Sequence, residues 1–245
     1  MKPPILAATQ VSLLRQGQAI LEQINYEFAA GQVYAVIGPN GAGKSSLLRL
    51  LGLLEKPSQG RIVFQGTDTT ACWPDCLELR RQIGLVHQDP VRFQGTVFQN
   101  IALGLKFRRL PRPRIKERVR EILTDFDLTD LGPRSATTLS QGEAQKMALA
   151  RVMAFSPQVL LLDEPTASLD PRNTQECENL ITKINRGWGK TIILVTHDLG
   201  QAERVSQQIL FMHHGRIQET GPTAELIASP QNEQTKSFLA RKIIL

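Results

Sequence analysis

The chain has 245 residues, of which 41% are hydrophobic and 21% charged. These proportions are typical of a soluble globular protein with enough length for a sizeable core. The formal net charge of +6 suits a nucleotide, a nucleic acid or an anionic membrane surface, and does not choose among them. Aromatic residues make up only 5%, which disfavours a base-stacking nucleic-acid binder, so we expect no nucleic-acid partner.

The cysteines and the hydropathy limit where the protein works. Cys72, Cys76 and Cys177 form no disulfide framework and no recognisable metal site, so we expect thiols in a reducing compartment. The sequence has no run of about 18 apolar residues and no signal-peptide core at its start. If the protein works at a membrane, we expect another chain to provide the spanning part.

In chain order, half-polar segments come first, and apolar runs follow. Residues 5–30 and 60–66 predict short strands of an antiparallel sheet that flanks a nucleotide. Continuous apolar runs are typical of a parallel sheet covered on both faces, and helical patterns between them predict a doubly wound α/β core. The expected strands are 33–37, 84–86, 159–162 and 192–195, and the expected helices are 46–54, 143–154 and 174–185.

Residues 90–155 predict a helical lobe inserted between two strands of the core. Within it, residues 106–120 are strongly basic. A solvated face is the favoured interpretation, and contact with lipid head groups or nucleic acid stays open. Pro111 and Pro113 predict that the first half of this basic segment is a loop.

A phosphate-binding motif, G-x-x-x-x-G-K-[ST], lies between a predicted strand and a predicted helix, which is the context it needs. Its glycines let backbone N–H groups point at phosphate oxygens, and the helix N-terminus favours the same anion. Lys44 supplies a positive charge, and the Ser45 hydroxyl can ligate Mg²⁺. We expect ATP to contact Gly38, Pro39, Asn40, Gly41, Ala42, Gly43, Lys44, Ser45 and Ser46.

Two acids end the apolar run at 159–162. Asp163 lies at the strand's carboxyl end, where open α/β sheets bind ligands, and its carboxylate suits Mg²⁺. Glu164 is one residue further on and suits a general base or a water-positioning group. An acid pair alone is weak evidence, but together with the phosphate loop it predicts a nucleotide-hydrolysing site.

Three further elements are ambiguous when taken singly. Ser140 with Glu143 three residues on reads as a helix-capping box. Gln88 and His197 each lie just past a predicted strand. A polar residue at such a position is usually incidental, so only their order along the chain gives them meaning.

That order resembles the ATPase subunit of ABC transporters over nearly the whole chain. The phosphate loop is followed by Gln88, then by a Leu-Ser-Gln-Gly-Glu element that starts at Leu139, and then by the acid pair, Asp170 and His197. Ser140 precedes Asp163 by 163 − 140 = 23 residues, the separation that this family's layout needs. The resemblance implies a P-loop NTPase (RecA-like) core with a flanking antiparallel β subdomain and an inserted helical subdomain.

The resemblance also implies one domain over 1–245. Residues 1–89 and 156–220 would form the core with its β subdomain, 90–155 the helical subdomain and 221–245 a C-terminal tail. It implies a head-to-tail homodimer with two ATP molecules at the interface. Each ATP would meet Lys44 and Asp163 of one copy and the signature of the other, made of Ser140, Gln141, Gly142 and Glu143.

Roles for the remaining polar residues follow from the same resemblance. Glu164 would polarise the attacking water, and His197 would contact the γ-phosphate. Gln88 would touch Mg²⁺ and the water and couple the site to a membrane partner. Asp170 would bridge across the dimer.

Two departures from the family pattern concern the signature and the adenine contact. The usual signature, Leu-Ser-Gly-Gly-Gln, has a glycine in place of Gln141 and a glutamine in place of Glu143. The aromatic residue that usually stacks on adenine aligns with Arg15, whose guanidinium can stack on a purine. Tyr26 is the nearest aromatic downstream and is expected to belong to a strand.

Residues 89–101 are similar to importers of small solutes, especially the oxyanions tungstate, molybdate and phosphate. The implied partners are two transmembrane permease subunits and an extracytoplasmic solute-binding protein, with this chain peripheral on the cytoplasmic face of the membrane. An exporter and an amino-acid or metal-ion importer stay open. A non-transport ABC ATPase of DNA repair or translation usually needs two nucleotide domains or a long coiled coil, and a P-loop kinase or GTPase would leave the later motifs unexplained.

Overall fold

The computed structural model describes residues 4–243, within which no helix is both long and apolar enough to cross a membrane. The strands are β1 (Pro4–Arg15), β2 (Gln18–Ala29), β3 (Val33–Ile37), β4 (Gln59–Phe64), β5 (Thr67–Asp68), β6 (Ile83–Val86), β7 (Val159–Asp163), β8 (Thr191–Val195), β9 (Gln208–His213) and β10 (Arg216–Pro222). The helices are α1 (Lys44–Leu51), α2 (Leu77–Arg80), α3 (Val97–Phe107), α4 (Arg112–Asp125), α5 (Gln141–Met153), α6 (Pro171–Trp188), α7 (Leu199–Val205), α8 (Thr223–Ala228) and α9 (Glu233–Ile243).

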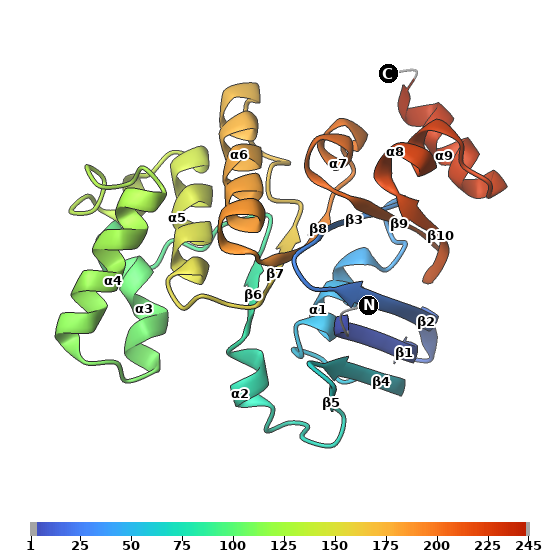
Figure 1. The fold of residues 1–245 in the computed structure, drawn as a ribbon, viewed down its shortest axis with the longest axis horizontal. Coiled ribbons are helices and arrows are strands. Elements are labelled where there is room, and N and C mark those ends of the chain that lie inside the picture. Colours follow the sequence, from blue (N-terminus) through green and yellow to red (C-terminus); the bar gives the residue numbers. More distant parts are fainter. Residues whose placement is uncertain (1–3, 244–245) are drawn as a thin grey trace.

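The central sheet has six strands in the order β10-β9-β3-β8-β7-β6. Strands β9, β3, β8, β7 and β6 run parallel to their neighbours, and β10 closes one edge antiparallel to β9. The four apolar runs of the sequence are β3, β6, β7 and β8, so the prediction of a doubly wound core is confirmed. These strands are almost entirely apolar because the sheet is covered on both faces (Figure 1).

Alternate residues of the parallel strands pack into two different cores. Tyr34 of β3 and Leu161 of β7 face α1 and the β1–β2–β4 sheet. Val33 and Leu160, their neighbours along the strands, face α5 and α6. The period of two in a strand thus divides the sheet between the two layers seen in Figure 1.

A second sheet, in the order β2-β1-β4-β5, packs on the far side of α1 (Figure 1). It is antiparallel, as expected from the sequence. The expectation of short strands was wrong, because β1 and β2 each have 12 residues. Register shifts interrupt their pairing, for example between Ala8 and Val11, and such bulges blur the alternation from which strand length is predicted.

Between β6 and β7 the chain forms α3, α4 and α5, which gather at one end of the molecule in Figure 1. The predicted loop is present but shorter than expected, because it covers only residues 108–111. The α3 helix continues to Phe107, and α4 begins at Arg112 with Pro113 in its first turn. Proline is well tolerated there, because the first N–H groups of a helix have no partner within the helix.

The basic segment at 106–120 is partly structural. Arg108 stacks on the ring of Phe155 at 4.3 Å, and Arg118 donates to the carbonyl oxygen of Ala154 at 3.0 Å. These two arginines attach α3 and α4 to the chain that follows α5. Other basic side chains of the segment, such as Arg112 and Lys116, are exposed, as expected for a solvated face.

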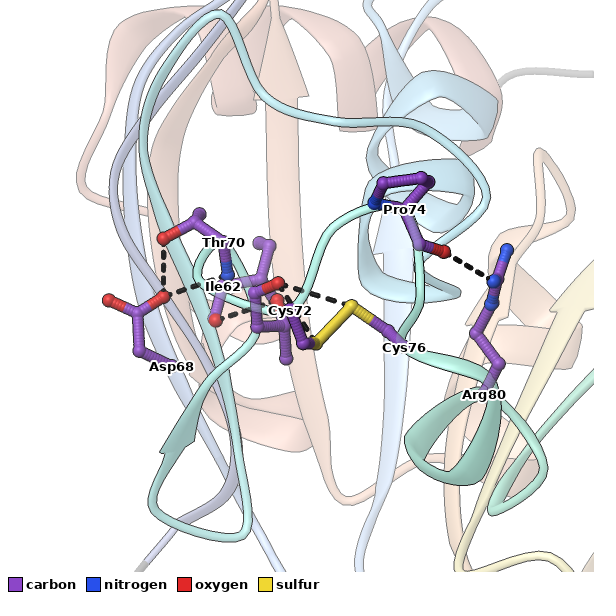
Figure 2. Close-up of a disulfide and its surroundings, with 8 residues drawn as sticks. Ile62, Asp68, Thr70, Cys72, Pro74, Cys76 and Arg80 are labelled. Carbon is purple, nitrogen blue, oxygen red and sulfur yellow. Dashed lines mark hydrogen bonds between the residues drawn. A yellow bond between two sulfur atoms is a disulfide. The ribbon is translucent and has the colours of Figure 1, made fainter.

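The expectation of thiols at Cys72 and Cys76 was wrong, because the structure joins them in a disulfide (Figure 2). The loop between β5 and α2 turns back on itself and brings their Cα atoms to 5.2 Å, within the range that a disulfide needs. Arg80 of α2 donates to the carbonyl oxygen of Pro74 in this loop at 2.6 Å. A separation of four residues permits this approach but does not require it, so the spacing alone could not reveal the bond.

Candidate functional site: a phosphate loop and the ends of three parallel strands

The core of the site lies where β3, β7 and β8 end. These strands are neighbours or next neighbours in the sheet and all run in the same direction. Their carboxyl ends therefore lie along one edge, with the phosphate loop after β3, Asp163 and Glu164 at the end of β7, and His197 after β8. This edge is where open α/β sheets bind their ligands.

The phosphate loop lies against the backbone behind it so closely that two glycines are required. A Cβ on Gly38, whose φ is 146°, would lie 2.1 Å from the carbonyl oxygen of Met212. A Cβ on Gly43, whose φ is 96°, would lie 2.9 Å from the carbonyl oxygen of Ile20. Gly215 also donates its N–H to the Ala42 carbonyl at 3.1 Å, which ties the loop to the β9–β10 turn.

Helix α1 begins at the loop without a side-chain cap, since its N-cap residue is Gly43. The N–H groups of its first turn are therefore positioned to bind an anion. Lys44 is 6% exposed, and its Nζ donates to the carbonyls of Gly38 at 2.8 Å and Pro39 at 2.9 Å. The ammonium group is thus held over the loop that the motif predicts for phosphate. Asn40, Gly41 and Ser45 are exposed, and Ser46 is half-buried.

Two side chains with oxygen donors or acceptors meet although 118 residues separate them in sequence. The Ser45 hydroxyl donates to Asp163 Oδ1 at 3.1 Å. Burial raises the pKa of Asp163 above its usual range, and the Ser45 hydrogen bond acts in the opposite direction. Among the described residues no group of three His, Cys, Asp or Glu side chains gathers as a metal site. One hydroxyl and one carboxylate fit Mg²⁺, which usually keeps waters and takes its other ligands from nucleotide phosphates.

Glu164 and His197 form a pair, with Glu164 Oε2 2.6 Å from His197 Nδ1. Glu164 has a left-handed backbone, with φ at 47°, and donates its N–H to the Val195 carbonyl at 2.9 Å. A non-glycine residue in this region is strained, and such strain persists only where the surrounding structure fixes it. This backbone and the contact with His197 therefore give the Glu164 carboxylate a defined position, one residue after Asp163. Gln88 is exposed two residues beyond β6.

The signature residues lie at the start of α5, where the predicted capping box is present. The Ser140 Oγ accepts from the N–H of Glu143 at 3.3 Å, and Glu143 Oε2 accepts from the N–H of Ser140 at 2.7 Å. Arg134 lies 3.5 Å from Glu143 Oε1. The Ser140 N–H holds the pKa of the Glu143 carboxyl below its usual range, with a smaller contribution from Arg134.

Sequence reasoning missed Asn173, which packs against the signature. A Cβ on Gly142 would lie 2.1 Å from Asn173 Oδ1. Asp170 caps α6 by accepting from the Asn173 N–H at 2.9 Å, and it also accepts from the Asn173 side chain at 2.5 Å. Asp170 therefore positions the side chain that requires glycine at 142. The Asp-Pro pair at 170–171 is a helix-start signal that could have placed the cap.

Arg15, at the end of β1, forms a two-point ion pair with Glu55. Its Nε donates to Glu55 Oε1 at 3.0 Å, and its Nη2 donates to Oε2 at 2.5 Å. Arg49 reaches the same carboxylate at 3.4 Å. These bonds use the edge of the guanidinium, which leaves its flat faces suited to stacking. Stacking on adenine stays a prediction.

The sequence and the fold are similar to those of known proteins. Residues 21–167 match the family model described as ABC transporter. "Phosphate import ATP-binding protein PstB 2" of Natronomonas pharaonis is 38% identical over 98% of this chain and 87% of its own length. "Methionine import ATP-binding protein MetN" of Latilactobacillus sakei is 37% identical over 92% of this chain, which spans only 66% of that relative.

Two solved structures share the fold. The cbiO1 protein of Clostridium perfringens, described as part of an ABC transporter complex, has a TM-score of 0.87 and 31% identity, covering 99% of this chain and 95% of cbiO1. A dimeric ATP-binding cassette bound to ADP and phosphate has a TM-score of 0.80 and 28% identity, covering 89% of this chain and 98% of that one. With its phosphate loop, strand-end acids and capped signature helix, the chain belongs to the ABC transporter family as one of its ATP-binding, ATP-hydrolysing subunits.

Proposed function

We propose that Glu164, held by His197, activates water against an ATP bound at the phosphate loop, and that this hydrolysis drives solute import through membrane partners. The observation that carries the proposal is the 2.6 Å contact between Glu164 and His197 beside the Ser45–Asp163 pair. A carboxylate in this position can accept a proton from water or orient the water for attack. The His197 ring orients that carboxylate, and we assign the same ring to the γ-phosphate.

The nucleotide is bound by groups of this chain that are already in place. The N–H groups at the start of α1 and the Lys44 ammonium bind the phosphates. Ser45, Asp163 and Gln88 would hold Mg²⁺, which supplies positive charge against the transferring phosphoryl group. The raised pKa of Asp163 fits this assignment, because a cation offsets the cost of a buried carboxylate.

The second half of the site comes from another copy of the chain. Ser140 and Gly142 lie at the start of α5, whose N-terminal end favours an anion as α1 does. We assign them to the γ-phosphate of an ATP held by the partner copy, with Asp170 at the dimer interface. The dimeric state of the related ATP-binding cassette with ADP and phosphate supports this arrangement.

A mixing experiment tests the shared site. A Ser140→Arg chain mixed with a Lys44→Ala chain leaves at most one complete site in each mixed dimer, so steady-state ATPase activity should stay well below that of the unmutated protein. Full activity in the mixture would contradict composite sites. An equal mixture of the unmutated protein with a Glu27→Gln chain is the control, because Glu27 is an exposed residue of β2 away from the strand ends.

The transported solute is proposed from the relatives and from residues 89–101. We place an inorganic oxyanion first, since the phosphate relative covers 98% of the chain and the 89–101 segment is similar to oxyanion importers. The methionine relative favours an amino-acid importer as the second candidate. In either case the partners are two permease subunits and a solute-binding protein, with this chain on the cytoplasmic face of the membrane.

Uptake measurements separate the two solutes. Cells that carry only a Glu164→Gln chain should lose uptake of radiolabelled oxyanion, tested as phosphate, molybdate and tungstate, and should retain methionine uptake. Loss of methionine uptake alone would overturn the oxyanion assignment.

A further inference from the structure

The segment that follows β6, residues 88–93, contacts the side chains of α5 and α3. Arg151 of α5 donates to the Val91 carbonyl at 2.8 Å, and its guanidinium lies 5.0 Å from the centre of the Phe93 ring. Asn100 of α3 accepts from the Phe93 N–H and donates to the Phe93 carbonyl, both at 3.0 Å. The segment thus has fixed attachments to two helices, although it begins at the exposed Gln88.

Between these attachments, one side chain reaches the signature. Arg92 Nη2 donates to Gln141 Oε1 at 2.7 Å, across 49 residues of sequence. Gln141 is the first residue of α5 and lies between Ser140 and Gly142. The position is usually glycine in the family, and glycine has no side chain that could accept this bond. The contact is therefore a consequence of this chain's own departure from the usual signature.

Buried polar groups next to this contact are left without partners. Within the described part of the chain, the Arg92 Nε–H is buried and unpaired, and both polar atoms of the Gln145 side chain are buried and unpaired. Gln145 is one helical turn beyond Gln141, on the same side of α5. Since a buried polar group without a hydrogen bond is costly, a rearrangement that gives the guanidinium a second acceptor on α5 is favourable.

We propose that Arg92 is a positioning residue that links the segment after Gln88 to the signature by bonding to Gln141. The bond is charge-assisted and directional, so a displacement of residues 88–92 moves the start of α5, which holds Ser140 and Gly142. Arg92 itself touches no nucleotide. The inference rests on the proposed function in one respect, namely that Ser140 and Gly142 act on an ATP bound by the partner copy.

A double-mutant cycle on the full-length chain tests the link. Arg92→Ala should lower kcat for ATP about fivefold, the typical effect of losing one net hydrogen bond, and should leave ATP binding to the separate chain unchanged. In the Gln141→Gly background, Arg92→Ala should have no further effect on kcat, because the bond is already absent. An equal loss in both backgrounds would overturn the proposal.

Rescue and control variants distinguish positioning from a general structural role. Arg92→Lys should keep part of the activity. Gln141→Glu should keep the link as an ion pair, so that the effect of Arg92→Ala on kcat becomes larger and falls as salt is added. A salt-independent effect would contradict the direct bond. Arg112→Ala, an exposed arginine at the start of α4, should leave kcat and thermal unfolding unchanged.

The mixing experiment with Ser140→Arg and Lys44→Ala separates the two proposals. If that mixture has full activity, the composite site is wrong. The Arg92–Gln141 bond would then have no composite site to position, so both proposals would fail. If the mixture has more activity than either variant alone, but less than the unmutated protein, while the Arg92 and Gln141 substitutions act additively, the composite site stands and the positioning role of Arg92 is wrong.

Discussion

Helices α1 and α5 begin at the two halves of the proposed site, and they begin in opposite ways. Helix α1 follows a glycine loop with no side-chain cap, while α5 has both members of a capping box bonded to each other. At α1, positive charge lies over the loop through Lys44, which is almost fully buried. At α5, Glu143 places a carboxylate in the first turn, with Arg134 beside it.

This difference predicts different roles for the two helices: α1 would bind the nucleotide, and α5 would act on a nucleotide that is already bound. The first turn of α1 can bind phosphate strongly by itself, because its backbone donors have no competing side chain. At α5 the N–H groups of Ser140 and Glu143 are bonded within the capping box, and the Glu143 carboxylate disfavours an incoming anion, so this first turn should bind phosphate more weakly than that of α1. We therefore expect α1 to determine ATP affinity and α5 to determine turnover in the assembled dimer.

The largest expected effect on turnover is that of replacing Glu164, at the ends of the parallel strands. Glu164→Gln keeps the shape of the side chain but removes the proton acceptor, so kcat should fall about 10²–10⁴-fold while ATP still binds. Steady-state phosphate release and equilibrium ATP binding measure the two parts. The matched control is Glu27→Gln. Normal turnover in Glu164→Gln would remove this residue from the mechanism.

Lys44→Ala tests whether α1 determines affinity. Loss of one charged hydrogen-bond donor to phosphate should weaken ATP binding about 10–100-fold, as measured by fluorescence titration or calorimetry. Lys56→Ala, at an exposed lysine a few residues beyond α1, should bind ATP normally. Unchanged affinity in Lys44→Ala would contradict the phosphate-loop assignment.

Ser140→Ala tests whether α5 determines turnover instead. We expect kcat to fall about tenfold with unchanged ATP binding to the separate chain, since the hydroxyl's hydrogen bond to an anionic phosphate is lost. Thr96→Ala is the matched control, because Thr96 forms a capping box with Gln99 at α3. Both variants should lose about 1 kcal/mol of unfolding free energy. If Thr96→Ala lowers kcat as much as Ser140→Ala, the effect is one of stability alone.

The smallest expected effect concerns the charge of Glu143. Its pKa is lowered in the folded chain, so its carboxylate contributes stability above the unfolded pKa and loses that contribution as the pH falls through the folded value. Glu143→Gln should cost about 0.5 kcal/mol at neutral pH and nothing in strong acid, measured by urea unfolding at several pH values. The mirror variant Gln99→Glu at α3 should introduce the same pH dependence there. A pH-independent difference would contradict the charge argument.

Much of the fold could be predicted because the parallel strands of the central sheet are nearly continuous apolar runs. The run at 33–37 became β3 with the same bounds, and the acid pair fell at the end of β7 as expected. In each of these cases the signal is local, or is repeated in neighbouring strands.

What escaped prediction depends on contacts between distant side chains. No local pattern connects Arg92 with Gln141, and Asn173 gains its role only by packing on Gly142. The disulfide at Cys72 depended on how one loop turns. The bulges in β1 likewise broke the alternation that would have given its length. Such features are set by the tertiary fold, and a sequence pattern cannot carry them.

The three native cysteines leave the folded protein well suited to site-specific labelling at an introduced cysteine. Two of them are joined to each other, and the third, Cys177, is 2% exposed, with burial raising the pKa of its thiol to about 12. Because thiol reagents react with an accessible thiolate, the folded chain should be nearly inert to maleimide under non-reducing conditions. A cysteine introduced on an exposed face of α5 could therefore carry a fluorophore without background labelling, and a pair of labelled copies would report the approach of two chains in real time.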